Sequence, residues 1–412
     1  MTETIRLPET IEHVAVDALL AYPKNSRTHS ADQVAAVARS IRAYGFTNPI
    51  LVHGTTIIAG HGRMMAARQI GLATVPAIRL DHLTEAEARA YVIADNRLAE
   101  LAGWDEAILA EELRALQGEG FDLSLTGWEG KELDELLFEP PAAKTGADDA
   151  PPVREEAKTK AGDVWVLGKH RVMCGDSTSA EQVQVLMGGG VADMVFTDPP
   201  YGVDYDGGHA VKGKRREKLA NDGDAAIYSA VLPVVFSSSK ETAALYLWFS
   251  DSKSAAVTAA VTAAVTAAGY EVRNTLIWNK NLAQFGAIGA QYKSKHEPCL
   301  YCFKRGSAPK WRGPTNEVSV WDVKRESKNE FHPTQKPIEL VERAVANSSD
   351  VGDTVLDVFG GSGSTIIGCE NTGRQGRAME INPLYCDVIV RRWQNFTGQR
   401  AIHAVTGEPF GD

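Results

Sequence analysis

Apolar runs of strand length alternate with helical stretches throughout the second half of the chain. The runs are DVWVLG (163–168), HRVMCGD (170–176), ADMVFTD (192–198), AALYLWFSD (243–251), NTLIWNK (274–280), HEPCLYCFK (296–304), DTVLDVFGG (353–361) and RQGRAMEIN (374–382). Strands that are separated by helices pair in parallel and bury both faces, so their sequences are almost continuously apolar. The alternation therefore predicts an α/β fold, with βαβ units around a mainly parallel sheet.

A change of composition near residue 138 divides the chain, whose 412 residues are too many for one ordinary hydrophobic core. Residues 139–162 are rich in Pro, Ala and charge and lack apolar periodicity, so we expect a linker there. Residues 1–138 combine short strands with a helix that Ser30 caps, which predicts a smaller α+β domain with a helical extension. Residues 163–412 form the larger α/β domain.

The composition is typical of a globular protein in a reducing compartment. The chain is 44% hydrophobic and 23% charged, and no run approaches the roughly 18 apolar residues of a membrane span. The first residues lack the layout of a signal peptide, so we expect a cytoplasmic protein without membrane contact. Cys299 and Cys302 form a lone CxxC, which is better explained by a buried strand than by zinc. No metal is expected.

Positive charge is concentrated in one segment of an otherwise acidic chain. The formal net charge is −10, yet residues 202–336 hold 19 Lys and Arg against 13 Asp and Glu. The basic residues gather in VKGKRREK (211–218), CFKRGSAPKWR (302–312) and DVKRESK (322–328), which favours a polyanionic partner over three ordinary solvated faces. The candidate nucleic-acid contacts are Lys214, Arg215, Arg216, Lys310, Arg312, Lys324 and Arg325.

A glycine-rich turn lies between a strand and a helix in DTVLDVFGGSGSTIIGCENTG (353–373). Glycines allow a close approach of the backbone to a ligand at the carboxyl edge of the sheet. Glu380 ends the next strand, 17 residues after Gly363, where a carboxylate accepts hydrogen bonds from ribose hydroxyls. The pattern predicts a nucleoside-containing ligand; the P-loop lysine is missing, and NAD stays open at this point.

The stretch TDPPYG (197–202) directly follows the apolar run that ends at Phe196. Asp198 is therefore expected at the same sheet edge, where two prolines hold its carboxylate and the neighbouring carbonyl rigidly. Two fixed acceptors suit an exocyclic amine, and Tyr201 offers a stacking face for a flat ring. The alternative is a proline-rich turn without function.

Three motifs together resemble the amino-group DNA methyltransferases that use S-adenosylmethionine: DPPY (198–201), HPTQKP (332–337) and FGGSGS (359–364). Their order resembles the permuted β class, over about residues 162–400, and implies a Rossmann-like methyltransferase fold. The resemblance implies a base that is flipped out of double-stranded DNA and held by the catalytic residues Asp198, Pro199, Pro200 and Tyr201. It implies cofactor contacts from Asp357, Phe359, Gly361, Ser362, Gly363 and Glu380, with Asp176, Thr334 and Lys336 as further candidates.

The first residue of the catalytic motif bears on the target base. In this family Asp at that position, as in Asp198, is usual for N6-adenine, and Ser is more frequent for N4-cytosine, which favours adenine. Target recognition is expected from loops near 202–223, 282–295 and 305–331, where Trp311 and Trp321 either enter a groove or pack the loop. Cytosine remains the alternative, and a homodimer is left open. RNA or protein glutamine is a weaker alternative, because those enzymes favour Asn at the first position.

Residues 48–78 resemble the ParB-like domain of chromosome-partition proteins, which is related to sulfiredoxin, and the resemblance covers about residues 10–100. The motif residues are Gly60, His61, Gly62 and Arg63. Partition proteins more often carry an acidic residue and consecutive arginines there, so nucleotide hydrolysis and nuclease activity are not expected, whereas DNA contact is. The rival hypothesis is a ParB-like DNA-binding or nuclease protein with an accessory methyltransferase half, and a restriction-modification role accompanies the favoured one.

Overall fold

The structure is a computed structural model that describes residues 10–140, 146–200, 226–249, 255–280, 295–324 and 335–411. The chain divides into two compact units, Met1–Leu137 and Phe138–Asp412. Within the described ranges, no helix combines the length and the apolar character that crossing a bilayer requires.

The first unit contains a five-stranded mixed sheet with the strand order β1-β5-β3-β4-β2. Its strands are β1 (Glu12–Ala15), β2 (Leu20–Ala21), β3 (Ile50–His53), β4 (Thr56–Ala59) and β5 (Thr74–Arg79). Its first three α-helices are α1 (Ala31–Tyr44), α2 (His61–Gln69) and α3 (Glu85–Glu100). The Ser30 hydroxyl caps α1 by accepting from the Gln33 N–H at 3.1 Å. The predicted α+β domain is confirmed.

Two further helices complete the first unit. They are α4 (Glu106–Gly118) and α5 (Gly130–Leu137), with a short 3₁₀ turn, Leu123–Thr126, between them. Asp105 caps α4 by accepting from the Ile108 N–H at 3.2 Å, and Leu113 of α4 is buried. These elements follow the five-stranded sheet in the chain and are helical.

The second unit is built on a ten-stranded sheet with the order β12-β10-β11-β9-β8-β13-β14-β7-β6-β15. The strands are β6 (Val164–Leu167), β7 (His170–Cys174), β8 (Ala192–Thr197), β9 (Ser239–Trp248), β10 (Tyr270–Asn279), β11 (His296–Lys304), β12 (Val320–Asp322), β13 (Thr354–Asp357), β14 (Gln375–Glu380) and β15 (Ile402–His403). The five central strands, β7, β14, β13, β8 and β9, are parallel, whereas β11 is antiparallel to both of its neighbours.

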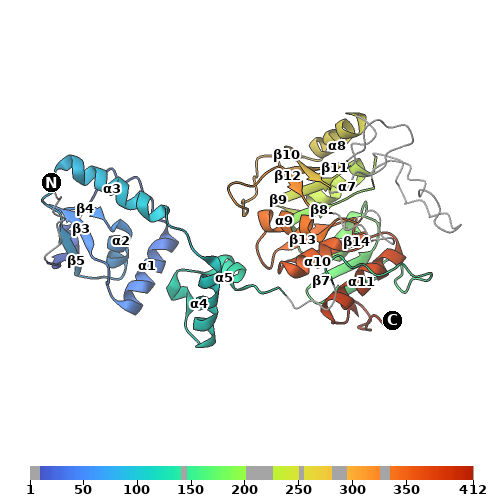
Figure 1. Ribbon diagram of the computed structural model, residues 1–412, viewed down its shortest axis with the longest axis horizontal. Helices are drawn as coiled ribbons and strands as arrows, with labels where there is room; N and C mark the ends of the chain where they lie inside the picture. The colour runs from blue at the N-terminus through green and yellow to red at the C-terminus, as the bar shows by residue number, and fades with distance from the viewer. Residues whose placement is uncertain are drawn as a thin grey trace. The chain divides into compact units, whose positions relative to one another are not determined.

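Helices cover both faces of this sheet, which confirms the predicted α/β fold (Figure 1). One face carries α6 (Ala180–Met187), α7 (Ala226–Ser237) and α8 (Ala255–Ala267), and the other carries α9 (Ile338–Ser348), α10 (Ser364–Asn371) and α11 (Pro383–Thr397). Neighbouring residues of one strand pack against helices on opposite faces of the sheet, because side chains alternate along a strand. Val195 packs in the first layer and Met194 and Phe196 in the second.

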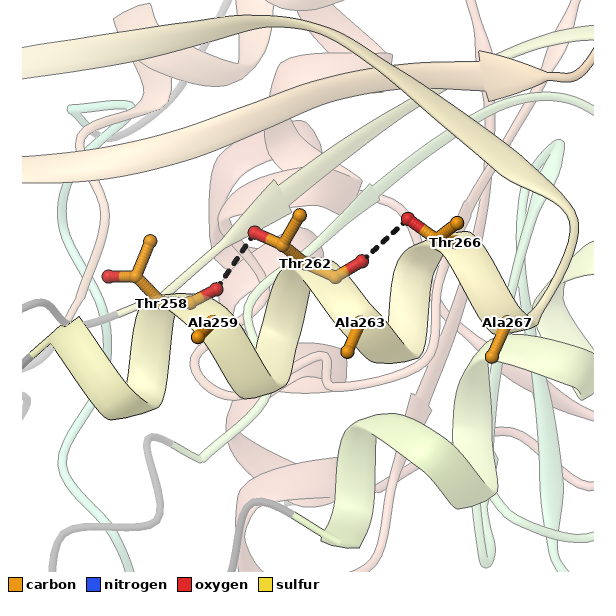
Figure 2. Close-up of a pocket in the computed structure, with 6 residues that line it drawn as sticks. All are labelled: Thr258, Ala259, Thr262, Ala263, Thr266 and Ala267. Atoms are coloured by element: carbon orange, nitrogen blue, oxygen red, sulfur yellow. Dashed lines mark hydrogen bonds between the residues drawn. The ribbon is translucent and has the colours of Figure 1, made fainter.

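Helix α8 is rich in Ala, Val and Thr, and it connects β9 to β10. Val261 and Val265 are fully buried on one side. On another side the Thr262 and Thr266 hydroxyls donate to the carbonyls of Thr258 and Thr262, both at 2.8 Å (Figure 2). These hydroxyls are therefore used within the helix, and α8 serves as a crossover.

The described part of the predicted linker, residues 146–162, is bound to the second unit. The Asp148 carboxylate accepts from the Ile338 N–H at 3.1 Å, at the start of α9. The Asp387 carboxylate of α11 accepts from the backbone N–H groups of Lys158 and Thr159 at 2.7 and 3.0 Å. Although this segment lacks apolar periodicity, hydrogen bonds between carboxylates and backbone N–H groups fix it to the second unit.

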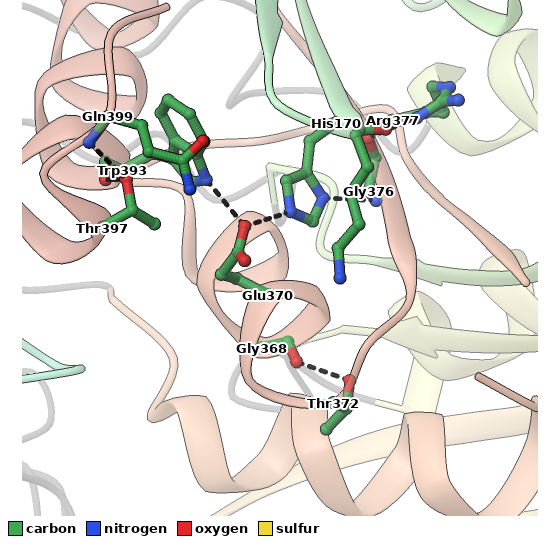
Figure 3. A network of polar contacts seen from close by, with 10 residues as sticks. His170, Gly368, Glu370, Thr372, Gly376, Arg377, Trp393, Thr397 and Gln399 are labelled. Carbon is green, nitrogen blue, oxygen red and sulfur yellow. Dashed lines mark hydrogen bonds and ion pairs between the residues drawn. The ribbon is translucent and has the colours of Figure 1, made fainter. Parts of the chain in front are cut away.

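A buried polar network fixes the amino end of the parallel strands (Figure 3). The Gly376 N–H donates to Nδ1 of His170 at 2.8 Å, so the ring proton lies on Nε2, which donates to Glu370 Oε2 at 2.7 Å. The Trp393 indole donates to the same oxygen at 2.9 Å. Burial lowers the pKa of His170, against the effect of Glu370, and keeps the ring neutral. The network joins β7, β14, α10 and α11.

Candidate active site

The carboxyl ends of the five parallel strands meet at one edge of the second unit, called here the carboxyl edge. The chain order reverses between β8 and β13, and open α/β sheets bind ligands at such a switch point. Asp198 directly follows β8, and Asp357 is the last residue of β13. The Thr197 hydroxyl donates to Asp357 Oδ1 at 3.1 Å, so the two sequence motifs lie next to each other.

Asp357 is a buried carboxylate that only uncharged groups contact among the described residues. Its oxygens accept from the Phe359 N–H at 3.0 Å and from the Thr365 hydroxyl at 2.6 Å. Burial raises the pKa of Asp357 to about 6, although these hydrogen bonds oppose the shift. Its charge is therefore costly, and a positively charged ligand would relieve that cost.

Glu380 occupies an equivalent place at the end of β14. Its carboxylate accepts from the N–H groups of Gly361 and Asn382 at 2.9 and 3.0 Å. Burial raises the pKa of Glu380 to about 7, again against the effect of these hydrogen bonds. The carboxylate thus fixes the glycine-rich turn beside β14.

The glycine-rich turn requires glycine for two separate reasons. Gly361 and Gly363 have φ values of 52° and 85°, in the left-handed region that favours glycine. A Cβ on Gly360 would approach Ile389 Cδ1 to 3.0 Å and the Met379 carbonyl oxygen to 3.2 Å. The turn is therefore pressed against β14 and α11, with its backbone close to the two acids.

Ser362 faces the protein interior, although the sequence suggests a ligand contact for it. The Ser362 carbonyl and hydroxyl oxygens accept from Arg392 of α11 at 3.0 and 3.3 Å. Phe359, at the start of the turn, is partly buried against the helical layer of α6, α7 and α8. Of these two candidates, Ser362 helps to hold α11, whereas Phe359 lies beside the ends of the strands.

Lys336 lies beside the predicted catalytic acid, whereas the sequence suggests a cofactor contact for it. Its Nζ is 2.6 Å from Asp198 Oδ2 and also forms an ion pair with Glu297. The ammonium lies 5.1 Å from the centroid of the Trp248 ring. Burial by itself would lower the pKa of Lys336, but Asp198 and Glu297 outweigh that effect and raise it. The lysine is therefore a fixed cation at the carboxyl edge.

Glu297 and Lys280 are site residues that the sequence analysis does not identify. Lys280 Nζ lies 2.8 Å from Glu297 Oε2 and 4.9 Å from the centroid of the Trp278 ring. Burial alone would raise the pKa of Glu297, but Lys336 and Lys280 lower it to about 2. The available signal is a charged residue at the end of an apolar run, in IWNK and HEPCLYCF.

Several other candidates take structural positions or lie outside the described residues. The exposed Asp176 closes a turn after β7, because its Oδ1 accepts from the N–H and hydroxyl of Thr178 at 2.9 and 2.8 Å. Pro199 is buried and Pro200 is half-buried directly after Asp198. The candidates outside the described residues are Tyr201, Thr334, Lys214, Arg215, Arg216 and Arg325.

The described basic candidates differ in their exposure. Lys310 and Lys324 are exposed, but Arg312 forms an ion pair with Asp350 and donates its backbone N–H to the Asn347 carbonyl at 2.9 Å. Trp321 is buried in the core of the sheet, so it packs the loop and does not enter a groove. The predicted recognition loop 202–223 and residues 282–294 of the predicted loop 282–295 lie outside the described residues.

The ParB-like motif of the first unit is folded back on its own domain. Gly60 adopts a φ of 94° before α2, and the Arg63 guanidinium lies against it and donates to the Pro49 carbonyl at 3.3 Å. His61 Nε2 accepts from the Tyr22 N–H at 3.2 Å. Burial lowers the pKa of both Arg63 and His61. These contacts use the motif residues to pack α2.

Three family models match the chain. A model described as DNA methylase covers residues 192–391, and one described as ParB N-terminal domain covers residues 3–96. A third, described as ParB-methyltransferase HTH domain, covers residues 107–161, which include α5 and all of α4 except Glu106. The sequence analysis predicts helices there but does not identify a helix-turn-helix domain.

Individual proteins match parts of the chain. The ParB-like nuclease domain-containing protein YnaK of Escherichia coli K12 is 48% identical over 68 residues, 16% of this chain and 78% of that protein. The type II methyltransferase M.Cfr9I of Citrobacter freundii is 30% identical over 139 residues, 31% of this chain and 45% of that protein. This chain thus spans less than half the length of that methyltransferase.

One solved structure, that of the M1.HpyAVI–SAM complex, matches with a TM-score of 0.42 and 19% identity. The match covers 54% of this chain and 97% of that one.

Proposed function

Because the chain belongs to the N6/N4 DNA methylases and carries a ParB N-terminal domain, we propose that it methylates an amino nitrogen of a base in DNA. The observation that carries the proposal is the position of Asp198 next to Asp357, bridged by Thr197 at the switch point of the sheet. An acceptor for an amino group and a ligand cradle then share one edge.

The residues around the glycine-rich turn fit S-adenosylmethionine as the methyl donor. Asp357 and Glu380 are desolvated acids that a cationic ligand with ribose hydroxyls would stabilise, and Gly361 leaves the backbone open to a close approach. Glu380 would hold the ribose, and Asp357 would face the methionine end. When bound, S-adenosylmethionine supplies an electrophilic methyl group on a positively charged sulfur.

Asp198 acts as a hydrogen-bond acceptor for the target amino group. With the carbonyl of Pro199 it holds both N–H groups, which draws the nitrogen from planar toward tetrahedral geometry and makes its lone pair available. The amino nitrogen would form a bond to the methyl carbon as the bond from that carbon to the sulfonium sulfur breaks, which would leave a neutral thioether. The nitrogen would then lose one proton to solvent. Lys336 pairs with the Asp198 carboxylate and orients it, so catalysis rests on position and electrostatics. Tyr201 would stack on the flipped base.

Adenine is the proposed target, with N6 as the methylated atom. The support is the aspartate at the first position of the motif, which the family resemblance associates with adenine. Cytosine N4 is the alternative, because the matching family model covers both chemistries.

The first unit is proposed to bind DNA for the methylase unit. The helix pair α4 and α5 lies within the match to the ParB-methyltransferase HTH domain, which supports a contact with duplex DNA. Exposed Lys310 and Lys324 of the second unit are the described basic residues best suited to phosphate contacts. A nuclease is the rival activity, because the E. coli relative is named for a ParB-like nuclease domain.

The test is a methylation assay on the full chain with labelled S-adenosylmethionine and mixed-sequence duplex DNA. Hydrolysed DNA is analysed by mass spectrometry, and N6-methyladenine is the expected product. N4-methylcytosine would overturn only the choice of base. Nicked DNA without incorporated label would favour the nuclease, and an unmodified, uncut duplex would contradict both activities.

A further inference from the structure

Four charged side chains of alternating sign form a connected series at the carboxyl edge, called here the charge network. Lys280 pairs with Glu297, Glu297 with Lys336, and Lys336 with Asp198. Building on the proposed function, we infer that Glu297 and Lys280 are positioning residues that set the charge and orientation of Asp198 through Lys336. Neither residue belongs to the motifs of the sequence.

The members of the charge network come from four separate parts of the fold. Asp198 follows β8, Lys280 follows β10, Glu297 lies near the start of β11, and Lys336 lies shortly before α9. Because β11 is antiparallel to β9, its first residues lie at the carboxyl edge, where the parallel strands end. The network thus connects the catalytic side of the sheet to β10 and β11.

The burial of the network makes its charge balance important. Lys280, Glu297 and Lys336 are only 6%, 9% and 6% exposed, whereas the Asp198 side chain keeps 24% of its surface. A buried charge without a partner is costly, so each inner charge requires an opposite neighbour. The sum of the four charges is zero, and the most exposed end carries the proposed acceptor.

Two tryptophans restrict the lysines to fixed places. Lys336 lies over Trp248 and Lys280 over Trp278, and the two rings meet edge to face with centroids 6.4 Å apart. Flat aromatic faces attract ammonium groups and exclude water, which strengthens the ion pairs. Lys336 is thereby held as a preorganised partner of Asp198.

Changing one charge leaves the network unbalanced, and the sign of the imbalance depends on which residue is changed. Among the described residues, the titratable groups facing Lys336 are Asp198 after β8, Glu297 and the Cys299 thiol from β11, and, through Asp198, Asp357 from β13. Glu297→Gln leaves an excess cation and removes one of the two anions that hold the proton on Lys336. Lys280→Gln leaves an excess anion.

The experiment compares Glu297→Gln, Lys280→Gln and the double variant, in the full chain, by pH profiles of kcat for DNA methylation. Glu297→Gln is expected to lower kcat about 10- to 100-fold and to move the alkaline limb to lower pH, because Lys336 loses its proton more easily. Lys280→Gln is expected to lower kcat about threefold to tenfold and to move the acidic limb to higher pH. The double variant restores a neutral charge network. Its kcat should therefore exceed that of Glu297→Gln, and both limbs of its pH profile should return to their positions in the unsubstituted protein.

Lys304→Gln is the matched control. Lys304 is a buried lysine at the other end of β11 that lies 4.2 Å from the Phe236 ring centroid and pairs with Glu241. This variant should be less stable without moving either limb. Losses that multiply in the double variant, with unmoved limbs, would overturn the inference, because they indicate packing alone.

Thermal unfolding of the unliganded variants separates this inference from the proposed function. Excess cation should weaken the folded protein most at low pH and excess anion at high pH, and the double variant should show neither effect. If no protein methylates DNA but this pattern holds, the proposed function fails and the network stands. Identical pH profiles of unfolding for all three variants would overturn the network itself.

Discussion

The acids on the two sides of the switch point have opposite kinds of partner. On the side of β8 and β11, lysines neutralise the carboxylates, and the pKa of Glu297 falls to about 2. On the side of β13 and β14, N–H and hydroxyl groups contact Asp357 and Glu380, and burial raises their pKa values to about 6 and 7. Among the described residues, no ion pair reaches either of these two acids.

This difference in partners indicates different roles for the two groups of carboxylates. A carboxylate that is paired with a buried lysine keeps one charge state over a wide pH range, which suits a permanent acceptor for an amino group. A desolvated carboxylate without a cation changes its protonation when a ligand arrives. One side of the edge is thus built for constant charge, and the other for charge that depends on binding.

Asp198→Ala is the change with the largest expected effect on activity, because it removes the constant charge. We expect kcat for DNA methylation to fall by about 10²- to 10³-fold or more, as for other preorganised electrostatic groups. The affinity for S-adenosylmethionine should stay within about threefold, since Asp357 and Glu380 are untouched. Steady-state kinetics and calorimetry measure the two quantities, and an unchanged kcat would contradict the role of Asp198.

Glu380→Ala tests the acids on the side of β13 and β14. We expect the affinity for S-adenosylmethionine to fall by about 10- to 100-fold, the value of one or two hydrogen bonds to a charged group. At saturating cofactor, kcat should change much less than in Asp198→Ala. A titration that returns an unchanged Kd would remove Glu380 from the cofactor site.

The pH dependence of cofactor binding sharpens the comparison further. The raised pKa of about 7 means that Glu380 is mostly protonated at pH 6 in the free protein. A ligand that requires the carboxylate must displace this proton, so affinity should rise about tenfold from pH 6 to pH 8. Calorimetry in buffers of different ionisation enthalpy should detect proton release, and Glu380→Gln should abolish it. A flat profile in the unsubstituted protein would count against a binding-dependent charge.

Glu370→Gln should have the smallest effect on activity, because this buried carboxylate lies at the amino end of the strands. Burial alone would raise its pKa, but His170 and Trp393 lower it. Its stabilisation is therefore present above the ordinary pKa near 4.5 and is lost as the pH falls through the lower folded value. We expect a loss of about 1–3 kcal/mol in the free energy of unfolding at pH 7. Denaturant unfolding measures it, and a shifted kcat profile would show an unexpected link to the carboxyl edge.

The sequence predicts the acids that end parallel strands and misses those placed by antiparallel pairing. Asp198, Asp357 and Glu380 each follow or end an apolar run, and the parallel rule brings such ends together. Glu297 begins a run, so the same rule assigns it to the opposite edge; only the pairing of β11 with β9 corrects this. Lys336 is found through its motif, but the partner of its ammonium depends on tertiary contacts.

The sequence also does not reveal contacts made by segments that lack a periodic pattern of apolar residues. Asp148 and Asp387 hold residues 146–162 through backbone N–H groups, which composition alone presents as a linker. In the same way α4 and α5 are evident as helices, whereas their match to a helix-turn-helix model depends on the pattern as a whole.

The pairing of β11 carries a consequence for the assembly of the second unit. Glu297 lies opposite Trp278 of β10, in a register that runs on to His296 and Asn279. A slip by one residue would turn Glu297 to the other face of the sheet and leave two buried ammonium groups with one carboxylate. Out-of-register pairing of β11 would thus cost electrostatic energy as well as packing energy. The charge network therefore favours the correct register of the strand that carries Glu297.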